Sequence, residues 1–288
     1  MNRPSEPVQE LSQKEISWIR LAGENVAFVD EQWREILHES RLQTAEDFFS
    51  VAGEPLSKPG LGKRYRARLA LSGKNSFVYL KRYEGDTLAG LLSRWYEDGQ
   101  RSTPAEREVN VALALRQQTI AATIPVAYGQ SNNAGLNQKS FVVTAAVPGD
   151  SLENFFHNQK QIAWKEKLKI IETVAMLARK FHDNGWRHRD FYLCHIFISK
   201  TEGKIQLTLI DLARVFRPRW RPERWRIKDL AQLNYSARVK TFSRTARMRF
   251  AHEYFRCAKL SNVQKNLLRK IIKKTESISQ HDRKTKTR

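Results

Sequence analysis

The sequence lacks several features that would assign it to a simple class of protein. It has only two cysteines, Cys194 and Cys257, which are too few for a disulfide framework, so we expect two reduced thiols. No run of about 18 apolar residues occurs, which argues against a membrane-spanning helix. The first residues, MNRPSEPVQE, contain no apolar segment, so we expect no secretory leader. The 288 residues, 41% hydrophobic and 28% charged, instead predict a folded chain of one large domain or two modest ones.

Acidic residues are scarce in the last quarter of the chain. The whole sequence has 51 Lys and Arg residues against 30 Asp and Glu, a formal net charge of +21. Residues 1–213 contribute only +3 of this charge, whereas residues 214–288 contribute +18. Such a concentration of positive charge favours contact with a polyanion, either a nucleic acid or the anionic face of a membrane. Composition does not choose between these two.

The first half of the chain predicts a small β-rich unit. Basic and apolar residues alternate in RYRARLAL, which is typical of a half-exposed strand, and a hairpin turn at 72–75 leads to a second strand that carries Lys81. Thr103, Pro104 and Glu106 are typical of a helix start. In chain order we expect a short capped helix after Thr44, strands at 64–71, 76–83, 126–130 and 139–147, and the Thr103 helix between the second and third strands.

The second half predicts mostly helices. Pro148 and Gly149 interrupt the strand pattern, and we place a lobe boundary there. Between Trp164 and Asn184, apolar residues recur every three or four positions, as in an amphipathic helix that Gly185 ends. After it we expect a loop, a hairpin of two strands, and helical segments at 225–240 and 245–275.

Four chemically distinctive residues follow the order found in protein-kinase-like phosphotransferases. Lys81 lies on a strand, a helix with a glutamate follows, Asp190 ends the tripeptide His-Arg-Asp, and Asp211 ends a hairpin strand. A phosphotransferase needs a lysine to neutralise nucleotide phosphates and a glutamate to hold that lysine. It also needs one aspartate to accept the proton of the attacking hydroxyl and another to hold Mg²⁺.

Three stretches resemble one family closely. They run from His188 to Phe197, from Leu209 to Val215, and from Arg224 to Ala237. They are similar to the lipopolysaccharide kinases of Gram-negative bacteria, the Kdo/heptose kinase family, whose members phosphorylate inner-core sugars with ATP. The resemblance covers roughly residues 44 to 260. It implies a two-lobed α+β fold with a small, mostly antiparallel β lobe and a helical lobe.

The resemblance implies a role for each residue of the constellation. Lys81 would contact the nucleotide phosphates and pair with Glu108, a better match to the family than Glu106 at the helix start. Asp190 would be the catalytic base and Asp211 would hold Mg²⁺. His195 stands where general kinases have a metal-binding asparagine, so it is a candidate metal or phosphate contact, although imidazole is a poor Mg²⁺ ligand.

Other residues would bind the nucleotide or stabilise the catalytic loop. The resemblance suggests a phosphate-binding turn at Gly60 and Gly62, which is shorter than the usual glycine-rich loop. The hinge would be residues 145–147, with adenine bound by the backbone of Ala145 and Val147. We also expect His188 to stabilise the catalytic loop, and Asp229 to be a buried anchor for its backbone.

The segment after Asp211 favours a sugar acceptor. Asp229 follows Asp211 by only 18 positions, which leaves little room for a peptide-binding platform. The segment is dense in arginine and tryptophan, and Trp220 and Trp225 are candidates either for the core or for stacking on a sugar. A phosphorylated, acidic glycolipid at an anionic membrane surface fits this composition. We therefore expect a cytoplasmic enzyme, peripheral at the inner face of the membrane.

The sequence thus predicts four segments and one leading function. We expect an N-terminal extension (1–43), a kinase-like N-lobe (44–148), a kinase-like C-lobe (149–279) and a basic disordered tail (280–288). The leading function is an ATP- and Mg²⁺-dependent kinase of a heptose or Kdo of the lipopolysaccharide core. A protein (tyrosine) or small-molecule kinase, and a polyanion-binding pseudokinase, remain alternatives. Nucleic-acid binding rests on charge alone, and the oligomeric state stays open.

Overall fold

The computed structural model describes residues 16–286, and its described residues divide into two compact units. Unit 1 ends at Pro148 and unit 2 begins at Gly149. Within 16–286, the description leaves out residues 57–63, 73–76, 86–87, 89, 91, 93–101, 134, 160–161, 202 and 238–240. The glycine turn and most of the turn expected at 72–75 therefore lie outside the described residues.

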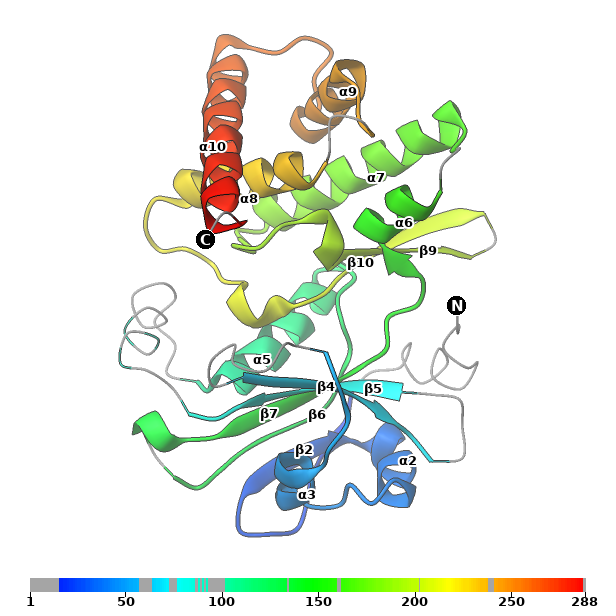
Figure 1. The fold of residues 1–288 in the computed structure, drawn as a ribbon, viewed down its shortest axis with the longest axis vertical. Coiled ribbons are helices and arrows are strands. Elements are labelled where there is room, and N and C mark those ends of the chain that lie inside the picture. Colours follow the sequence, from blue (N-terminus) through cyan, green and yellow to red (C-terminus); the bar gives the residue numbers. More distant parts are fainter. Residues whose placement is uncertain are drawn as a thin grey trace. The chain divides into compact units, whose positions relative to one another are not determined.

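Unit 1 is built on a seven-stranded antiparallel sheet (Figure 1). The strand order is β1-β2-β6-β7-β5-β4-β3. The four strands expected between residues 64 and 147 are confirmed to within two residues at each end. The strands are β1 (Trp18–Arg20), β2 (Val26–Asp30), β3 (Glu54–Pro55), β4 (Arg64–Ala70), β5 (Phe77–Tyr83), β6 (Pro125–Gln130) and β7 (Ser140–Ala145).

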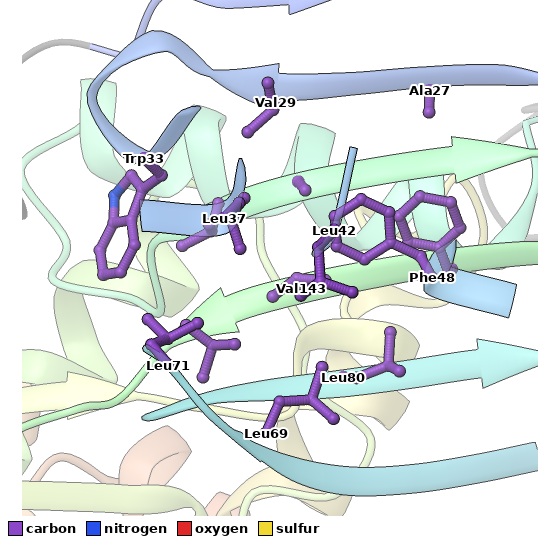
Figure 2. Packing of buried hydrophobic residues seen from close by; sticks show 14 of the residues in the cluster. Ala27, Val29, Trp33, Leu37, Leu42, Phe48, Leu69, Leu71, Leu80 and Val143 are labelled. Carbon is purple, nitrogen blue, oxygen red and sulfur yellow. The ribbon is translucent and has the colours of Figure 1, made fainter. Parts of the chain in front are cut away.

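Helices cover both faces of this sheet. On one face lie η1 (Glu31–Trp33), α2 (Arg34–Glu39) and α3 (Ala45–Ser50), and on the other lies α5 (Pro104–Gln117). Figure 2 shows Trp33, Leu37 and Phe48 packed with Leu80 and Val143 of the sheet. Side chains alternate along a strand, so Leu80 of β5 joins this core and the next residue, Lys81, lies on the α5 side.

The N-terminal segment differs from the separate extension that we expected. Strands β1 and β2 extend the sheet, and Ala27, Val29, Trp33 and Leu37 are buried in its core. The contribution was missed because β1 has only three residues and β2 five, so their patterns are too short to recognise. The capped helix after Thr44 is confirmed, because Thr44 and the third residue of α3 form a reciprocal capping box.

Unit 2 is mainly helical, with a small three-stranded sheet of order β10-β9-β8. The long amphipathic helix is confirmed as α7 (Trp164–Asp183), which buries Ile170, Val174, Ala178 and Phe181. The hairpin that precedes Asp211 is confirmed as well. The other elements are β8 (Asp150–Ser151), α6 (Leu152–Asn158), η3 (Leu193–His195), β9 (Ile196–Thr201), β10 (Lys204–Leu209), η4 (Leu212–Arg214), α8 (Pro222–Ser236), α9 (Arg244–Phe255) and α10 (Asn262–Lys286).

The C-terminal part departs from two expectations. The single helical segment predicted at 245–275 is two helices, because α9 ends at Arg256 with a left-handed φ of 50°. The chain that we expected to be disordered from residue 280 instead continues α10 to Lys286. There the Tyr235 hydroxyl of α8 lies 2.5 Å from Oδ2 of Asp282, so contacts with α8 extend into this polar end.

Candidate active site

Unit 1 holds a buried lysine–glutamate pair. Lys81 Nζ of β5 lies 2.5 Å from Oε1 of Glu108 on α5. The Tyr83 hydroxyl donates to Oε2 of the same carboxylate at 3.1 Å. Glu108 is only 1% exposed, so both of its oxygens are held away from bulk water. The other candidate, Glu106, lies in the first turn, where its backbone N–H donates to the Thr103 hydroxyl.

Unit 2 holds the His-Arg-Asp loop through Asp229, a fully buried residue of α8. Its Oδ2 accepts the backbone N–H of His188 at 2.7 Å, and its Oδ1 accepts that of Arg189 at 2.9 Å. Arg189 has a left-handed φ of 69°, which is uncommon for a residue with a side chain. The two charge-assisted bonds hold this turn, and the turn sets the direction of Asp190.

The same face of α8 continues this support. Gln232 Oε1 accepts the Phe191 N–H at 3.1 Å, and Gln232 Nε2 donates to the Arg189 carbonyl at 2.6 Å. One turn further, the Ser236 hydroxyl accepts the Leu193 N–H at 3.0 Å. Spacings of three and four along a helix place these side chains on one face, so α8 holds the loop from residue 188 to 193 as a rigid unit.

His188 contributes a buried hydrogen bond beneath the loop. Its side chain is completely buried, and its Nε2–H donates to the Ile210 carbonyl, just before Asp211, at 3.2 Å. Burial lowers the pKa of this imidazole, so the ring is neutral at pH 7. His188 therefore connects the two segments that carry the aspartates, in agreement with the structural role that we expected.

The free energy of unfolding should decrease in mild acid because two histidines are buried uncharged. Burial lowers the pKa of His182 as it does that of His188. In the unfolded chain each titrates near the ordinary value of about 6.5, so the unfolded state binds more protons below that pH. Each histidine should then lower the free energy of unfolding by up to about 1.4 kcal/mol per pH unit below pH 6.5. Above that pH it should have no effect. Urea denaturation between pH 7.5 and 5.5 measures this slope.

An exposed histidine provides the control for this pH dependence. His157 of α6 is exposed, so His157→Gln should leave the acid slope unchanged. A free energy of unfolding that stays constant from pH 7.5 to 5.5 would contradict the assignment of both buried rings.

Asp190 is paired with an arginine that the sequence analysis missed. Nη1 of Arg214 donates to both carboxylate oxygens of Asp190, at 3.0 and 2.8 Å. Arg214 ends the short helix η4, three residues after Asp211. The signal was present as Asp-x-x-Arg, but without the fold an arginine in a basic segment cannot be distinguished from its neighbours. The pairing fixes the orientation of the carboxylate.

His195 and Asp211 face each other beside Asp190. His195 Nδ1 lies 2.7 Å from the Asp190 carbonyl and therefore donates its proton to it. The opposite ring nitrogen, Nε2, lies 3.8 Å from Oδ2 of Asp211. Asp211 adopts a left-handed backbone conformation with φ 55° and ψ 60°, which ends β10 and turns the chain into η4.

The donor set suits Mg²⁺ only in part. Carboxylate oxygens of Asp211 are ligands that Mg²⁺ prefers, whereas an imidazole nitrogen is a poor one. Nε2 of His195 faces the Asp211 carboxylate, so a cation bound by that carboxylate would lie near the imidazole ring. Among the described residues, no group of three or more His, Cys, Asp or Glu could hold a metal ion by itself. Of these two residues only Asp211 would be a strong ligand, and Mg²⁺ usually completes its shell with water and substrate phosphate.

The expected nucleotide contacts are only partly within the described residues. Gly60 and Gly62 lie outside them. Ala145 ends β7, and its N–H donates to the Ile124 carbonyl at 2.9 Å, so this donor is already used within unit 1. Val147 follows in the irregular segment before unit 2. Of the two hinge residues that we expected, Val147 is therefore the better candidate for a backbone contact to adenine.

These parts define a class of protein. An ion-paired lysine on a strand, an aspartate on a helix-anchored His-Arg-Asp loop and a second aspartate after a hairpin are the parts of a protein-kinase-like phosphotransferase. The profile of the lipopolysaccharide kinase (Kdo/WaaP) family matches residues 61–254. The chain belongs to this family. It is thus a phosphotransferase whose acceptor is a sugar hydroxyl, and a kinase of this family implies ATP as phosphoryl donor.

Individual relatives of the chain support this family assignment. The chain is 34% identical to the lipopolysaccharide core heptose(I) kinase WaaP of Pseudomonas aeruginosa over 160 residues, which are 53% of this chain and 59% of that protein. It is 30% identical to WaaP of Escherichia coli over 217 residues, 73% of this chain and 80% of that protein. A solved structure described as WaaP in complex with acyl carrier protein matches with a TM-score of 0.67 and 25% identity, over 87% of this chain and 98% of that one. The expected two-lobed α+β kinase-like fold is confirmed. Among the described residues, no helix has the length and apolar composition to cross a bilayer.

Proposed function

We propose that this protein transfers the γ-phosphoryl group of ATP to a hydroxyl of a heptose or Kdo in the lipopolysaccharide inner core. The observation that supports this most strongly is the Asp190 loop, whose backbone is fixed by α8 and whose carboxylate is held by Arg214. The core heptose kinases named above support the choice of acceptor.

In this proposal Asp190 is the catalytic base. Its carboxylate accepts the proton of the sugar hydroxyl as the hydroxyl oxygen attacks the γ-phosphorus and the bond to the β-phosphate oxygen breaks. Arg214 holds the carboxylate in a fixed orientation for this step. Lys81, positioned by Glu108, binds the α- and β-phosphates, and its charge stabilises the leaving diphosphate.

Mg²⁺ would be held by Asp211, with His195 oriented beside that carboxylate. When bound, the metal neutralises phosphate charge and aligns the triphosphate for in-line transfer. His195, held in place by the Asp190 carbonyl, would lie beside the metal and the Asp211 carboxylate. Val147, together with Gly60 and Gly62, would bind the remaining parts of the nucleotide.

Breaking the Lys81–Glu108 pair should raise KM for ATP more than KM for the acceptor. We expect Glu108→Gln to raise KM for ATP about tenfold, because a buried charge-assisted hydrogen bond of about 1.5–3 kcal/mol no longer holds the ammonium in place. Steady-state kinetics with each substrate varied in turn measure the effect. Glu106→Gln, two residues away, should leave KM for ATP within twofold, and equal effects of the two changes would contradict the pairing role.

The basic composition of the last quarter fits a location at a membrane surface. Residues 214–288 carry a net charge of +18, and both a lipopolysaccharide precursor and a bilayer with anionic lipids present negative charge. We therefore propose a cytoplasmic protein that binds peripherally at the inner face of the membrane, where it meets its acceptor.

The acceptor class can be tested directly. Purified, dephosphorylated inner-core lipopolysaccharide is offered beside a protein mixture, with γ-labelled ATP and Mg²⁺. We expect label on the glycolipid and none on protein. Label on protein alone would contradict the proposal in favour of a protein kinase. No label on either acceptor, with ATP still bound, would contradict it in favour of a pseudokinase.

A further inference from the structure

Positively charged side chains gather around Trp225 in the first two turns of α8. The indole packs edge-on against Phe216, with ring centroids 5.3 Å apart. The charged end of Arg189 lies 5.1 Å from the indole ring centroid, and those of Arg224 and Lys228 each lie 5.6 Å from it. We call these residues, together with Arg214, the Trp225 cluster. Arg189 directly precedes Asp190, so the cluster adjoins the proposed base.

The cluster carries more positive than negative charge. Among the described residues, neither Arg224 nor Lys228 forms an ion pair with a carboxylate. The two carboxylates that attract Lys228 are already engaged, because Asp190 accepts from Arg214 and Asp229 accepts two backbone N–H groups. Each further cation placed there adds repulsion that these two carboxylates offset only in part.

Lys228 experiences this repulsion most directly. Its ammonium is partly buried, and burial lowers its pKa, followed by repulsion from Arg214 and Arg189. Attraction from Asp190 and Asp229 acts in the opposite direction. A solvated surface lysine would extend away from such neighbours. Lys228 instead stays over the indole ring, where a bound anion would relieve the repulsion.

We propose that the Trp225 cluster binds a carboxylate or phosphate group that the acceptor carries near the hydroxyl to be phosphorylated. This inference rests on the proposed function and specifies its substrate class as an anionic saccharide. The guanidinium groups offer paired donors that match the oxygens of either anion, and the indole ring provides an apolar surface beside them. The site therefore orients the acceptor sugar next to Asp190.

Lys228→Gln and Arg224→Gln test the site, with Lys259→Gln as control. Lys259 is exposed in unit 2 and outside the cluster, so its replacement makes the same change of charge elsewhere. Losing one charge-assisted contact should raise KM for a deacylated inner-core oligosaccharide about tenfold in each cluster variant. KM for ATP should stay within twofold, and Lys259→Gln should change neither constant. Two variants at separate positions, checked by thermal melting, guard against loss of fold.

The anion on the acceptor is tested by changing the acceptor. An oligosaccharide with its carboxylates reduced and its phosphates removed should bind wild type about tenfold more weakly. Lys228→Gln should bind this modified oligosaccharide and the natural one with equal affinity. The variant has already lost the contact that the modification removes. If Lys228→Gln raises KM for ATP instead, the cluster binds nucleotide phosphate, and the proposal is overturned. If it behaves like Lys259→Gln, the cluster is a solvated surface, and the proposal is overturned.

Titration calorimetry with the oligosaccharide in the absence of nucleotide separates this inference from the proposed function. Binding that weakens in Lys228→Gln, in a protein that transfers no phosphate, would support the site and contradict the function. Transfer by wild type with binding unchanged in both cluster variants would support the function and contradict the site.

Discussion

Asp190→Asn is expected to reduce phosphoryl transfer by about 10³-fold or more while ATP affinity stays within twofold. The side chains have nearly the same shape, and Arg214 can still donate to the remaining oxygen. The amide cannot accept the hydroxyl proton, and a positioned general base contributes about 10²–10⁴-fold. Initial rates with labelled ATP and saturating acceptor give the first quantity, and equilibrium binding of ATP gives the second.

The control for this variant is Asp183→Asn. Asp183 is an exposed aspartate at the end of α7, and its replacement should change neither rate nor affinity. Transfer by Asp190→Asn at more than a tenth of the wild-type rate would show that another group accepts the proton. Equal losses of transfer and ATP binding would show instead that the substitution disturbs the fold of the loop.

The second large effect should come from Asp229, although it touches neither substrate. Asp229→Asn replaces one acceptor oxygen with an amide that cannot accept the N–H of His188 or Arg189. A buried N–H without a partner costs about 1–3 kcal/mol. We expect the free energy of unfolding to fall by about 2–3 kcal/mol and transfer by at least about 10²-fold, because the Arg189 turn no longer fixes Asp190.

Two measurements distinguish loss of loop geometry from general unfolding. Urea denaturation gives the change in stability, and transfer measured well below the denaturation midpoint gives the rate of the folded variant. Glu223→Gln, on an exposed position of the same helix, should leave both within experimental error. Full activity in folded Asp229→Asn would disprove that α8 positions the catalytic loop.

Local sequence patterns predicted much of the fold. The Thr44 and Thr103 helix starts, strands β4 to β7 and helix α7 each carry a turn, cap or periodicity within a few residues, which a single sequence displays directly. Strands β1 and β2 do not, because three and five residues show no clear period. Their place at the edge of the sheet depends on pairing with β6, about 100 residues later.

The candidate site shows the same division between local and long-range information. Lys81, Asp190 and Asp211 were predicted from their order along the chain, and Asp229 was expected to be a buried anchor of the loop, as it is. Arg214 was not, because its role depends on contact with a residue 24 positions earlier. Gln232 and Ser236 were missed for the same reason, since their partners are loop N–H groups that the sequence does not distinguish.

The most direct test of the central claim is the position of the new phosphate. Wild-type protein, ATP and Mg²⁺ are incubated with dephosphorylated inner-core lipopolysaccharide. The product is then deacylated and analysed by mass spectrometry and ³¹P NMR. We predict one additional phosphomonoester on a heptose or Kdo hydroxyl of the core. A new phosphate on the lipid A part alone, or none on the glycolipid while ATP is consumed, would contradict the account.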